Sequence, residues 1–351
     1  MFVATALATI ALAAGGEAPF SGDLQPSVVV SSFTASAKQF GTRETLFWAA
    51  PDRFTVKPSQ KGVGRTVERG GVRTVGRGRG FPGSRITGTF PARPDGFSES
   101  FRIPSNEYSL ARARSGRRTF TSSRAGRRAA LKTSFRLAAN ECAGLEAGRA
   151  ELWVNRWTLM PLRYIERRGD RVLKTTIGYS RRNQAHPPGK FKQPRIGARA
   201  FPDSQGFVRT TPAEAAAELS SAPLLPTVLP KGFELTISGW APRSGFTGPE
   251  ASNPAYPELF AAVYRKGYER IDVTQRKSSE EWPSDPFGAE CGFLFTSKAT
   301  VNGNDAVFGT GPGFVPHLYW SDGELLHTLS GPYPKAELIA IAESLTPVST
   351  G

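Results

Sequence analysis

The sequence predicts an α+β fold in which one large antiparallel sheet precedes a smaller α+β domain. Large apolar residues alternate with Arg and Glu over residues 151–179, which is typical of antiparallel strands with one buried face. Short strand-like segments separated by Gly or Pro come before this stretch, as in a curved sheet. After residue 210 the strand-like segments are mixed with two helical ones.

The first half of the chain contains strands from about residue 25 onward. Pro51 cannot donate to a ladder, so it divides a strand at 43–48 from one at 53–56. Valines on either side of Gly70-Gly71 predict a hairpin, and Gly169-Asp170 closes the tightest turn within residues 151–179. Four further strands are expected at 86–90, 97–103, 117–122 and 129–138.

The second half begins after a Pro- and Gly-rich linker over residues 183–212. A helix over 211–219 follows, because Thr211, Pro212 and Glu214 form a capping-box pattern. A helix over 335–345 carries apolar residues on one face and closes the small α+β domain of residues 213–351. The strands expected between these helices are 233–240, 259–264, 269–275, 292–297, 305–309, 317–320 and 324–330.

The charge is divided unevenly along the chain. The net charge is +15, yet residues 1–200 carry 35 Lys and Arg against 13 Asp and Glu, whereas residues 201–351 carry 10 against 17. Opposite balances indicate two domains with different surfaces. The basic half could attract nucleic acid, anionic headgroups or an acidic partner, or it could simply be a solvated surface in an Arg-rich protein.

The N-terminus indicates export. Residues 1–16 form an apolar run that ends in small residues, so residues 1–20 are interpreted as a signal peptide or a truncated membrane anchor, with a buried core helix as the alternative. The expected location is periplasmic, or the extracytoplasmic face of the cell membrane. Export would permit a disulfide between Cys142 and Cys291, although two isolated thiols are the default.

Motifs for catalysis, metals and nucleic acid are weak. None of His186, His317 and His327 has a second ligand at metal-binding spacing, and no cofactor is expected. Ser321-Asp322 with the nearby histidines would suit a secreted hydrolase, but the sequence there reads more simply as a turn and lacks a nucleophile elbow. The RGG-like run at 77–81 fits hairpin loops better than a nucleic-acid site. We therefore expect neither an enzyme nor a nucleic-acid partner.

Several phrases, taken in order, resemble one group of exported proteins. They are Thr45-Leu-Phe-Trp-Ala-Ala-Pro-Asp-Arg-Phe54, Glu151-Leu-Trp-Val-Asn155, Met160-Pro-Leu-Arg163, Phe191-Lys-Gln-Pro-Arg-Ile-Gly-Ala198, Leu229-Pro-Lys-Gly-Phe-Glu-Leu235, Tyr319-Trp-Ser-Asp-Gly323 and Glu337-Leu-Ile-Ala-Ile-Ala-Glu-Ser-Leu345. Together they resemble the LolA-like outer-membrane lipoprotein carriers and their MucB/RseB-type relatives, which regulate envelope-stress sigma factors.

The resemblance implies a half-open antiparallel β-barrel with a helical plug over residues 25–182, followed by the small domain of the regulator type. It also implies an apolar cavity for acyl chains, because each buried methylene contributes about 0.8 kcal/mol. The aromatic candidates for lining such a cavity are Phe47, Trp48, Phe54, Trp153, Trp157 and Tyr164. Alternation alone does not say which of them face inward, and ordinary core packing is the competing interpretation.

An arginine cluster supplies the candidate contacts to anionic headgroups or to a partner. Its candidate members are Arg112, Arg114, Arg117, Arg118, Arg127 and Arg128, and Arg124 belongs to the same cluster. A solvated strand edge protected by charge would also explain it. Two departures from the carriers stand out, namely the absence of a lipobox Cys and Arg in the 70–80 hairpin where carriers place aromatics.

The first functional hypothesis is therefore an exported, non-enzymatic protein that binds lipid or an acylated lipoprotein. The alternative is an envelope-stress regulator that binds the extracytoplasmic domain of an anti-sigma factor.

Overall fold

The computed structural model describes residues 24–39, 42–58, 64–79, 82–91, 106–115, 119–139, 144–197, 201–204, 206–242, 258–277, 295–311 and 314–348. The predicted leader at 1–20, the predicted strand 97–103 and both cysteines lie outside these residues. Among the residues described, no helix is long and apolar enough to cross a membrane.

The first sheet has twelve strands in the order β12-β6-β5-β4-β3-β2-β1-β11-β10-β9-β8-β7. Its neighbours pair antiparallel except β12 with β6, and no pairing among the described residues joins the outer strands β12 and β7. The strands are β1 Ser32–Gln39, β2 Thr42–Ala49, β3 Arg53–Pro58, β4 Thr66–Arg69, β5 Val72–Val75, β6 Ser84–Thr87, β7 Thr121–Ala125, β8 Arg128–Leu137, β9 Gly148–Asn155, β10 Pro161–Arg168, β11 Arg171–Ser180 and β12 Phe201–Ser204.

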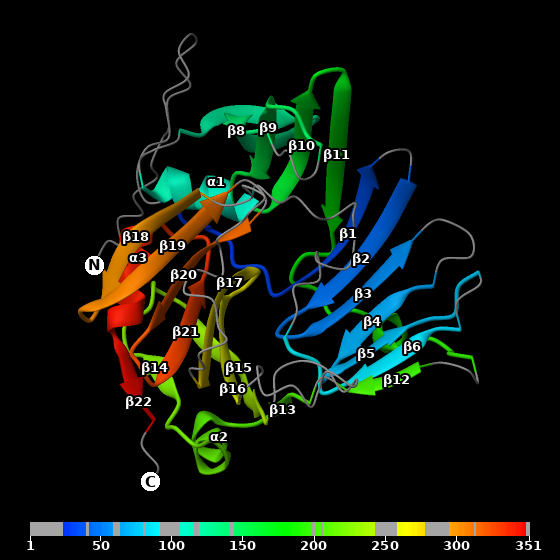
Figure 1. Ribbon diagram of the computed structural model, residues 1–351. Coiled ribbons are helices and arrows are strands. Elements are labelled where there is room, and N and C mark those ends of the chain that lie inside the picture. The colour runs from blue at the N-terminus through cyan, green and yellow to red at the C-terminus, as the bar shows by residue number, and fades with distance from the viewer. Residues whose placement is uncertain are drawn as a thin grey trace, which may run out of the picture.

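The second sheet has eight strands in the order β13-β15-β16-β17-β21-β20-β19-β18. A separate pair, β14 and β22, lies beside it (Figure 1). The strands are β13 Val208–Arg209, β14 Leu224–Pro226, β15 Glu234–Ala241, β16 Leu259–Lys266, β17 Glu269–Lys277, β18 Phe295–Val301, β19 Asn304–Gly311, β20 Phe314–Ser321, β21 Leu325–Ser330 and β22 Leu345–Pro347.

Local signals set the turns and one helix as the sequence predicts. Gly70 and Gly71 have φ values of 59° and 76° in the two-residue turn between β4 and β5, a conformation that favours glycine. Helix α2, Pro212–Glu218, has Thr211 as N-cap and the complete reciprocal capping box with Glu214. Helix α3, Lys335–Glu343, buries Leu338 and Ala342 on the predicted face.

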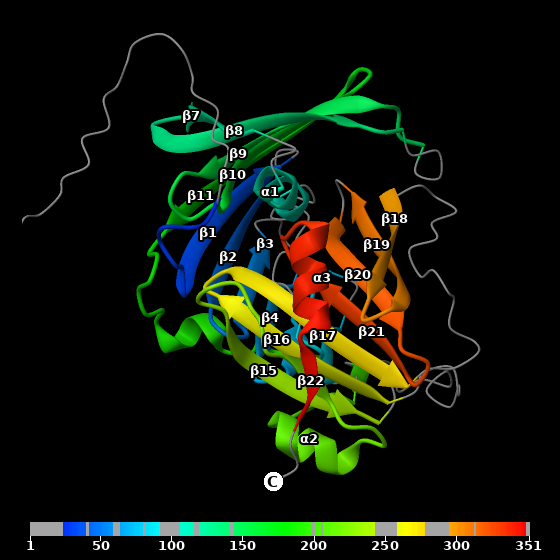
Figure 2. The same cartoon turned by 90° about the vertical axis from the view of Figure 1, so that its left-hand side faces the viewer.

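Helix α1, Asn106–Arg114, is not predicted by the sequence. It lies against the face of the first sheet that carries the main core, where Tyr108, Leu110 and Ala113 join a large apolar cluster (Figure 2). The interpretation of the arginine cluster as a strand edge is wrong for this segment. The fold is thus mostly antiparallel sheet with three α-helices in the part that the structure describes. The half-barrel with a helical plug remains a prediction.

The predicted linker over 183–212 contains regular structure. It includes a 3-10 helix, η3, at Pro188–Phe191, together with β12 of the first sheet and β13 of the second. The chain therefore passes from one sheet to the other between β12 and β13, inside the segment that the sequence predicts to be the linker.

Candidate functional site

The two sheets meet where the β16–β17 turn enters the core of the first sheet. Tyr268, in this turn, has its ring 5.5 Å from that of Phe33 and 5.4 Å from that of Trp48, both edge-on. Phe33 and Trp48 are each 1% exposed. Since both belong to the main core of the first sheet, the second sheet contributes directly to that core.

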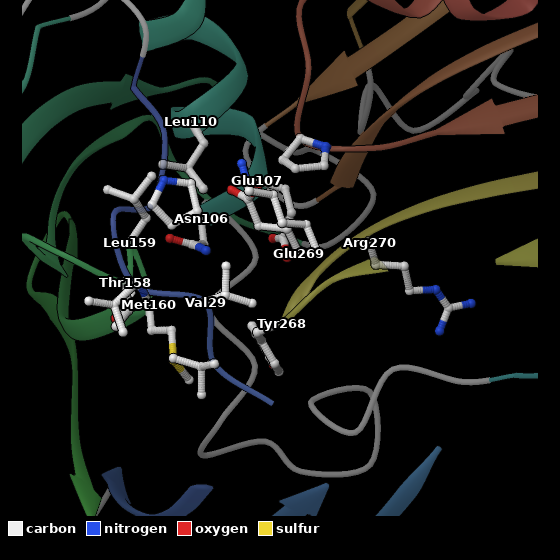
Figure 3. Close-up of a pocket in the computed structure, with 15 residues that line it drawn as sticks. Val29, Asn106, Glu107, Leu110, Thr158, Leu159, Met160, Tyr268, Glu269 and Arg270 are labelled. Carbon is white, nitrogen blue, oxygen red and sulfur yellow. Dashed lines mark hydrogen bonds between the residues drawn. The ribbon is translucent and has the colours of Figure 1, made fainter. Parts of the chain in front are cut away.

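A small pocket lies at this junction, between α1, the β9–β10 turn and the β16–β17 turn. Figure 3 shows Thr158, Leu159 and Met160 on one side of it and Glu269 and Arg270 on the other. It encloses about 30 Å³, which is room for about one water molecule. The junction pocket is therefore too small for an acyl chain.

Arg114, at the end of α1, forms a buried ion pair across the junction. Its Nη2 lies 2.6 Å from Glu269 Oε1, and the two side chains are 2% and 9% exposed. Nη1 donates to the carbonyl of Pro332 and Nε to that of Leu24, while the guanidinium stands over the ring of Tyr333. Arg114 is thus a buried contact between the sheets and not a surface cation for headgroups, which corrects its assignment in the arginine cluster.

A second charged contact joins β13 to the first sheet. Arg209 pairs with Asp52, and its Nη2 lies 4.0 Å from Glu68 Oε1, while Arg73 Nη2 lies 2.8 Å from Glu68 Oε2. Burial raises the pKa of Glu68, and the charge and hydrogen bond of Arg73 oppose that rise. Two clusters of ion pairs therefore fix how the sheets meet.

The six aromatic cavity candidates are not gathered at one surface. Trp48, Phe54 and Tyr164 are buried in the main core with α1. Trp153 is buried in a smaller cluster, with Lys132 and Arg163 each 4.8 Å from its ring centroid. Phe47 is half-buried beside His186 and Lys190, and Trp157 is exposed in the β9–β10 turn.

Alternation explains this separation of the six side chains. Neighbours along a strand point to opposite faces, so Phe47 and Trp48 cannot share a surface. The three that face the main core share one cluster with residues of α1 and with Tyr268, and each is at most 2% exposed. In this structure they are core residues, and an acyl chain would need a rearranged core to reach them.

A wide groove lies between α1 and β8 on one side and β18, β19 and α3 on the other. Its volume is about 800 Å³, within the range of ligand sites. It is lined by cationic and aromatic or apolar side chains, chiefly Arg112, Arg136, Lys335, Phe295, Phe308 and Ile339. Figure 2 shows α1 and β8 above, with α3, β18 and β19 below them and to the right.

Of the candidate residues in the arginine cluster, Arg112 lines this groove. Its guanidinium lies 5.7 Å from the ring centroid of Tyr108, and its buried Nε has no hydrogen-bond partner among the described residues. The positive charge of this side chain in the groove lining favours an anionic ligand. Arg127 and Arg128 are exposed at the β7–β8 hairpin, away from the groove lining, and Arg117 and Arg118 lie outside the described residues.

The hydrolase interpretation does not fit the geometry. His327 is 1% exposed, stacks on Trp320 at 4.8 Å and places Nε2 2.9 Å from Asp322 Oδ2. Ser321 Oγ accepts a hydrogen bond from Gly323 N, as in a turn. Burial lowers the pKa of His327, and Asp322 opposes this. A buried imidazole in a strand pairing cannot approach a substrate.

Sequence reasoning missed most of the groove. Arg136, Phe295, Phe308 and Lys335 come from segments far apart in the sequence and carry no shared motif. A signal for α1 does exist, since Asn106 and Glu107 stand at its start and Arg112 and Arg114 in its last turn, which suits the helix dipole. Among the described residues, no group of three His, Cys, Asp or Glu could hold a metal ion.

The fold and groove define a protein of two sheets that meet at the junction and also border a basic, partly aromatic groove. No family model and no curated protein matches the chain.

Among solved structures, the chain is similar to MucB in complex with MucA(peri), with 14% identity, a TM-score of 0.32 and coverage of 91% of this chain and 94% of that one. The Pseudomonas aeruginosa MucA/MucB complex gives 13% identity, a TM-score of 0.32 and coverage of 91% and 94%. A structure of MucB gives 12% identity, a TM-score of 0.32 and coverage of 92% and 94%.

Proposed function

We propose that this protein is an exported, non-enzymatic regulator that holds an acidic segment of an anti-sigma factor's extracytoplasmic domain in the groove between its sheets. The groove of about 800 Å³ is the observation that carries the proposal. The sequence phrases that resemble the MucB/RseB-type regulators support the same class of partner.

The groove chemistry suits an extended peptide with both acidic and apolar side chains. Arg112, Arg136 and Lys335 come from both walls, so carboxylates could be bound from two sides. Phe295 is 51% exposed, and Phe308 and Ile339 lie in the same lining, so apolar side chains would lose exposed surface on binding.

Lipid or acylated lipoprotein is the second candidate ligand. It is favoured by the exposed ring of Phe295 beside Lys335, since one wall then offers an apolar contact and a cation for a headgroup. The aromatic candidates of the main core do not add to this case, because each is at most 2% exposed. We therefore place a lipid ligand, if one is bound, in the groove.

The decisive experiment measures the affinity of the full chain for the extracytoplasmic domain of the anti-sigma factor encoded nearest to this gene, by isothermal titration calorimetry. Reversing Arg112 and Arg136 to Glu should weaken binding by at least about 100-fold, because two charge pairs become repulsive. The matched control reverses Lys231 and Lys277, two exposed lysines absent from the groove lining.

Equal affinity of both variants and the unmodified protein would contradict the groove as the binding site. Lipid extracted from the purified protein and identified by mass spectrometry, with no measurable peptide binding, would favour the second candidate.

A further inference from the structure

Three large apolar side chains are exposed together at one end of the first sheet. Val28, Val29 and Trp157 are 41%, 46% and 47% exposed, and we call them the apolar rim. Val28 N donates to the carbonyl of Trp157 at 3.0 Å, so the segment before β1 lies directly against the β9–β10 turn. Single exposed apolar residues are ordinary, but a cluster assembled from separate segments indicates an interaction site.

The apolar rim is held rigidly by two asparagines. Asn155 Oδ1 accepts hydrogen bonds from the backbone N–H groups of Trp157 and Thr158, each at 3.0 Å. Asn183 Nδ2 donates to the carbonyl of Val29 at 2.9 Å, and its Oδ1 accepts from Ser31 N at 2.8 Å. Trp157 is therefore presented to solvent on a fixed turn, so binding would not have to order it.

The charged residues next in sequence to the apolar rim, among those described, are positive. Arg156 precedes Trp157, while Arg181 and Arg182 precede the Asn183 that holds Val29, and both of these are exposed. Residues 24–31, 156–158 and 181–184 contain no Asp or Glu. Two carboxylates line the adjoining junction pocket: Glu107 is half-buried on α1, and Glu269 is paired with Arg114. The rim is thus an apolar tip flanked by three arginines.

We propose that the apolar rim docks on the surface of an anionic lipid bilayer, with Trp157 at headgroup depth and the three arginines on the headgroups. Trp favours the membrane interface because its ring is both apolar and polar, and basic residues beside it are attracted to anionic lipid. Three side chains are too few for a stable protein interface, which buries about 800 Å² on each partner. This surface lies apart from the groove and does not depend on the proposed function.

The test uses the quenching of tryptophan fluorescence by brominated lipid. The full chain is mixed with brominated vesicles of phosphatidylcholine alone or with half phosphatidylglycerol. The signal of Trp157 is the difference between the unmodified protein and Trp157→Phe. We expect this difference signal to be quenched only by the anionic vesicles. The matched control, Trp240→Phe in β15, should leave the amount of fluorescence lost to quenching unchanged.

Charge variants test whether vesicle binding depends on the arginines beside the apolar rim or on the overall positive charge of the first sheet. Arg181→Gln with Arg182→Gln should raise the vesicle concentration for half-maximal quenching by about 30-fold. Arg171→Gln with Lys174→Gln removes the same charge from exposed positions on β11 and should change it less than about threefold.

The proposal is overturned by three outcomes. They are no quenching of Trp157 by anionic vesicles, an equal loss in both pairs of charge variants, and a Trp157 signal that responds to an acidic peptide or single-stranded DNA but not to lipid.

Discussion

Replacing Arg114 should destabilise the protein by weakening the contact between its two sheets. Its guanidinium contacts Glu269 at 2.6 Å, the carbonyl of Pro332 at 2.6 Å and the carbonyl of Leu24 at 3.0 Å. Arg114→Met keeps most of the side-chain volume but leaves a carboxylate that is 9% exposed without its cation. Breaking one partner of such a buried pair costs about 3–5 kcal/mol, so the free energy of unfolding should fall by about that amount.

Urea unfolding followed by circular dichroism measures this change, and a double-mutant cycle assigns it. Glu269→Gln removes the charge of the partner, so Arg114→Met should cost about 1–3 kcal/mol less in that background. Arg112→Met, on the same helix and half-buried, is the matched control and should cost less than about 1 kcal/mol. A cost below about 1 kcal/mol for Arg114→Met, or strict additivity in the cycle, would refute the reasoning.

Three further predictions concern burial and charge elsewhere. Burial lowers the pKa of His327 below its usual 6.5, so the stability linked to this group is fully present above pH 6.5 and is lost as the pH falls. The melting temperature should therefore drop from pH 7 to pH 5, and less so in His327→Phe, whose ring can still stack on Trp320. Tyr268→Ala should cost about 2–3 kcal/mol in urea unfolding because it leaves a cavity against Phe33 and Trp48, whereas Tyr268→Phe should retain most of the stability. Arg73→Met leaves Glu68, whose pKa burial already raises, with only the more distant Arg209 at 4.0 Å. The destabilisation by Arg73→Met should therefore be larger at pH 7 than at pH 4.5, and equal values at both would contradict a buried ionised Glu68.

Local patterns predicted much of the fold. The glycines at 70 and 71 and the box of Thr211 with Glu214 act through neighbours within a few residues, so the sequence shows them directly. The alternation within residues 151–179 likewise reflects backbone geometry and gave β10 and β11 with their Gly169-Asp170 turn. Helix α1 was harder to predict because it is buried on several sides and has no clean apolar stripe.

The candidate site could not be predicted because its residues are far apart in the sequence and meet only in the folded chain. Alternation placed Trp48 and Trp153 on strands, but only α1 and Tyr268 decide that the first faces the main core and the second does not. Pairing of β1 with β11, residues separated by more than a hundred positions, likewise has no local signal. The groove joins Arg112 and Arg136 to Phe295 and Lys335, and their sequence spacing contains no hint of that proximity.

Site-specific photocrosslinking tests the groove most directly. A photoreactive phenylalanine at Ile339, in the lining of the groove, should crosslink to the extracytoplasmic domain of the anti-sigma factor. The same residue at Val208, which is 48% exposed on β13 and absent from that lining, should not. Crosslinking from Ile339 that disappears when Arg112 and Arg136 are reversed to Glu is the predicted result. Crosslinking from Val208 alone, or from neither position despite tight binding, would contradict the groove as the place where the partner is held.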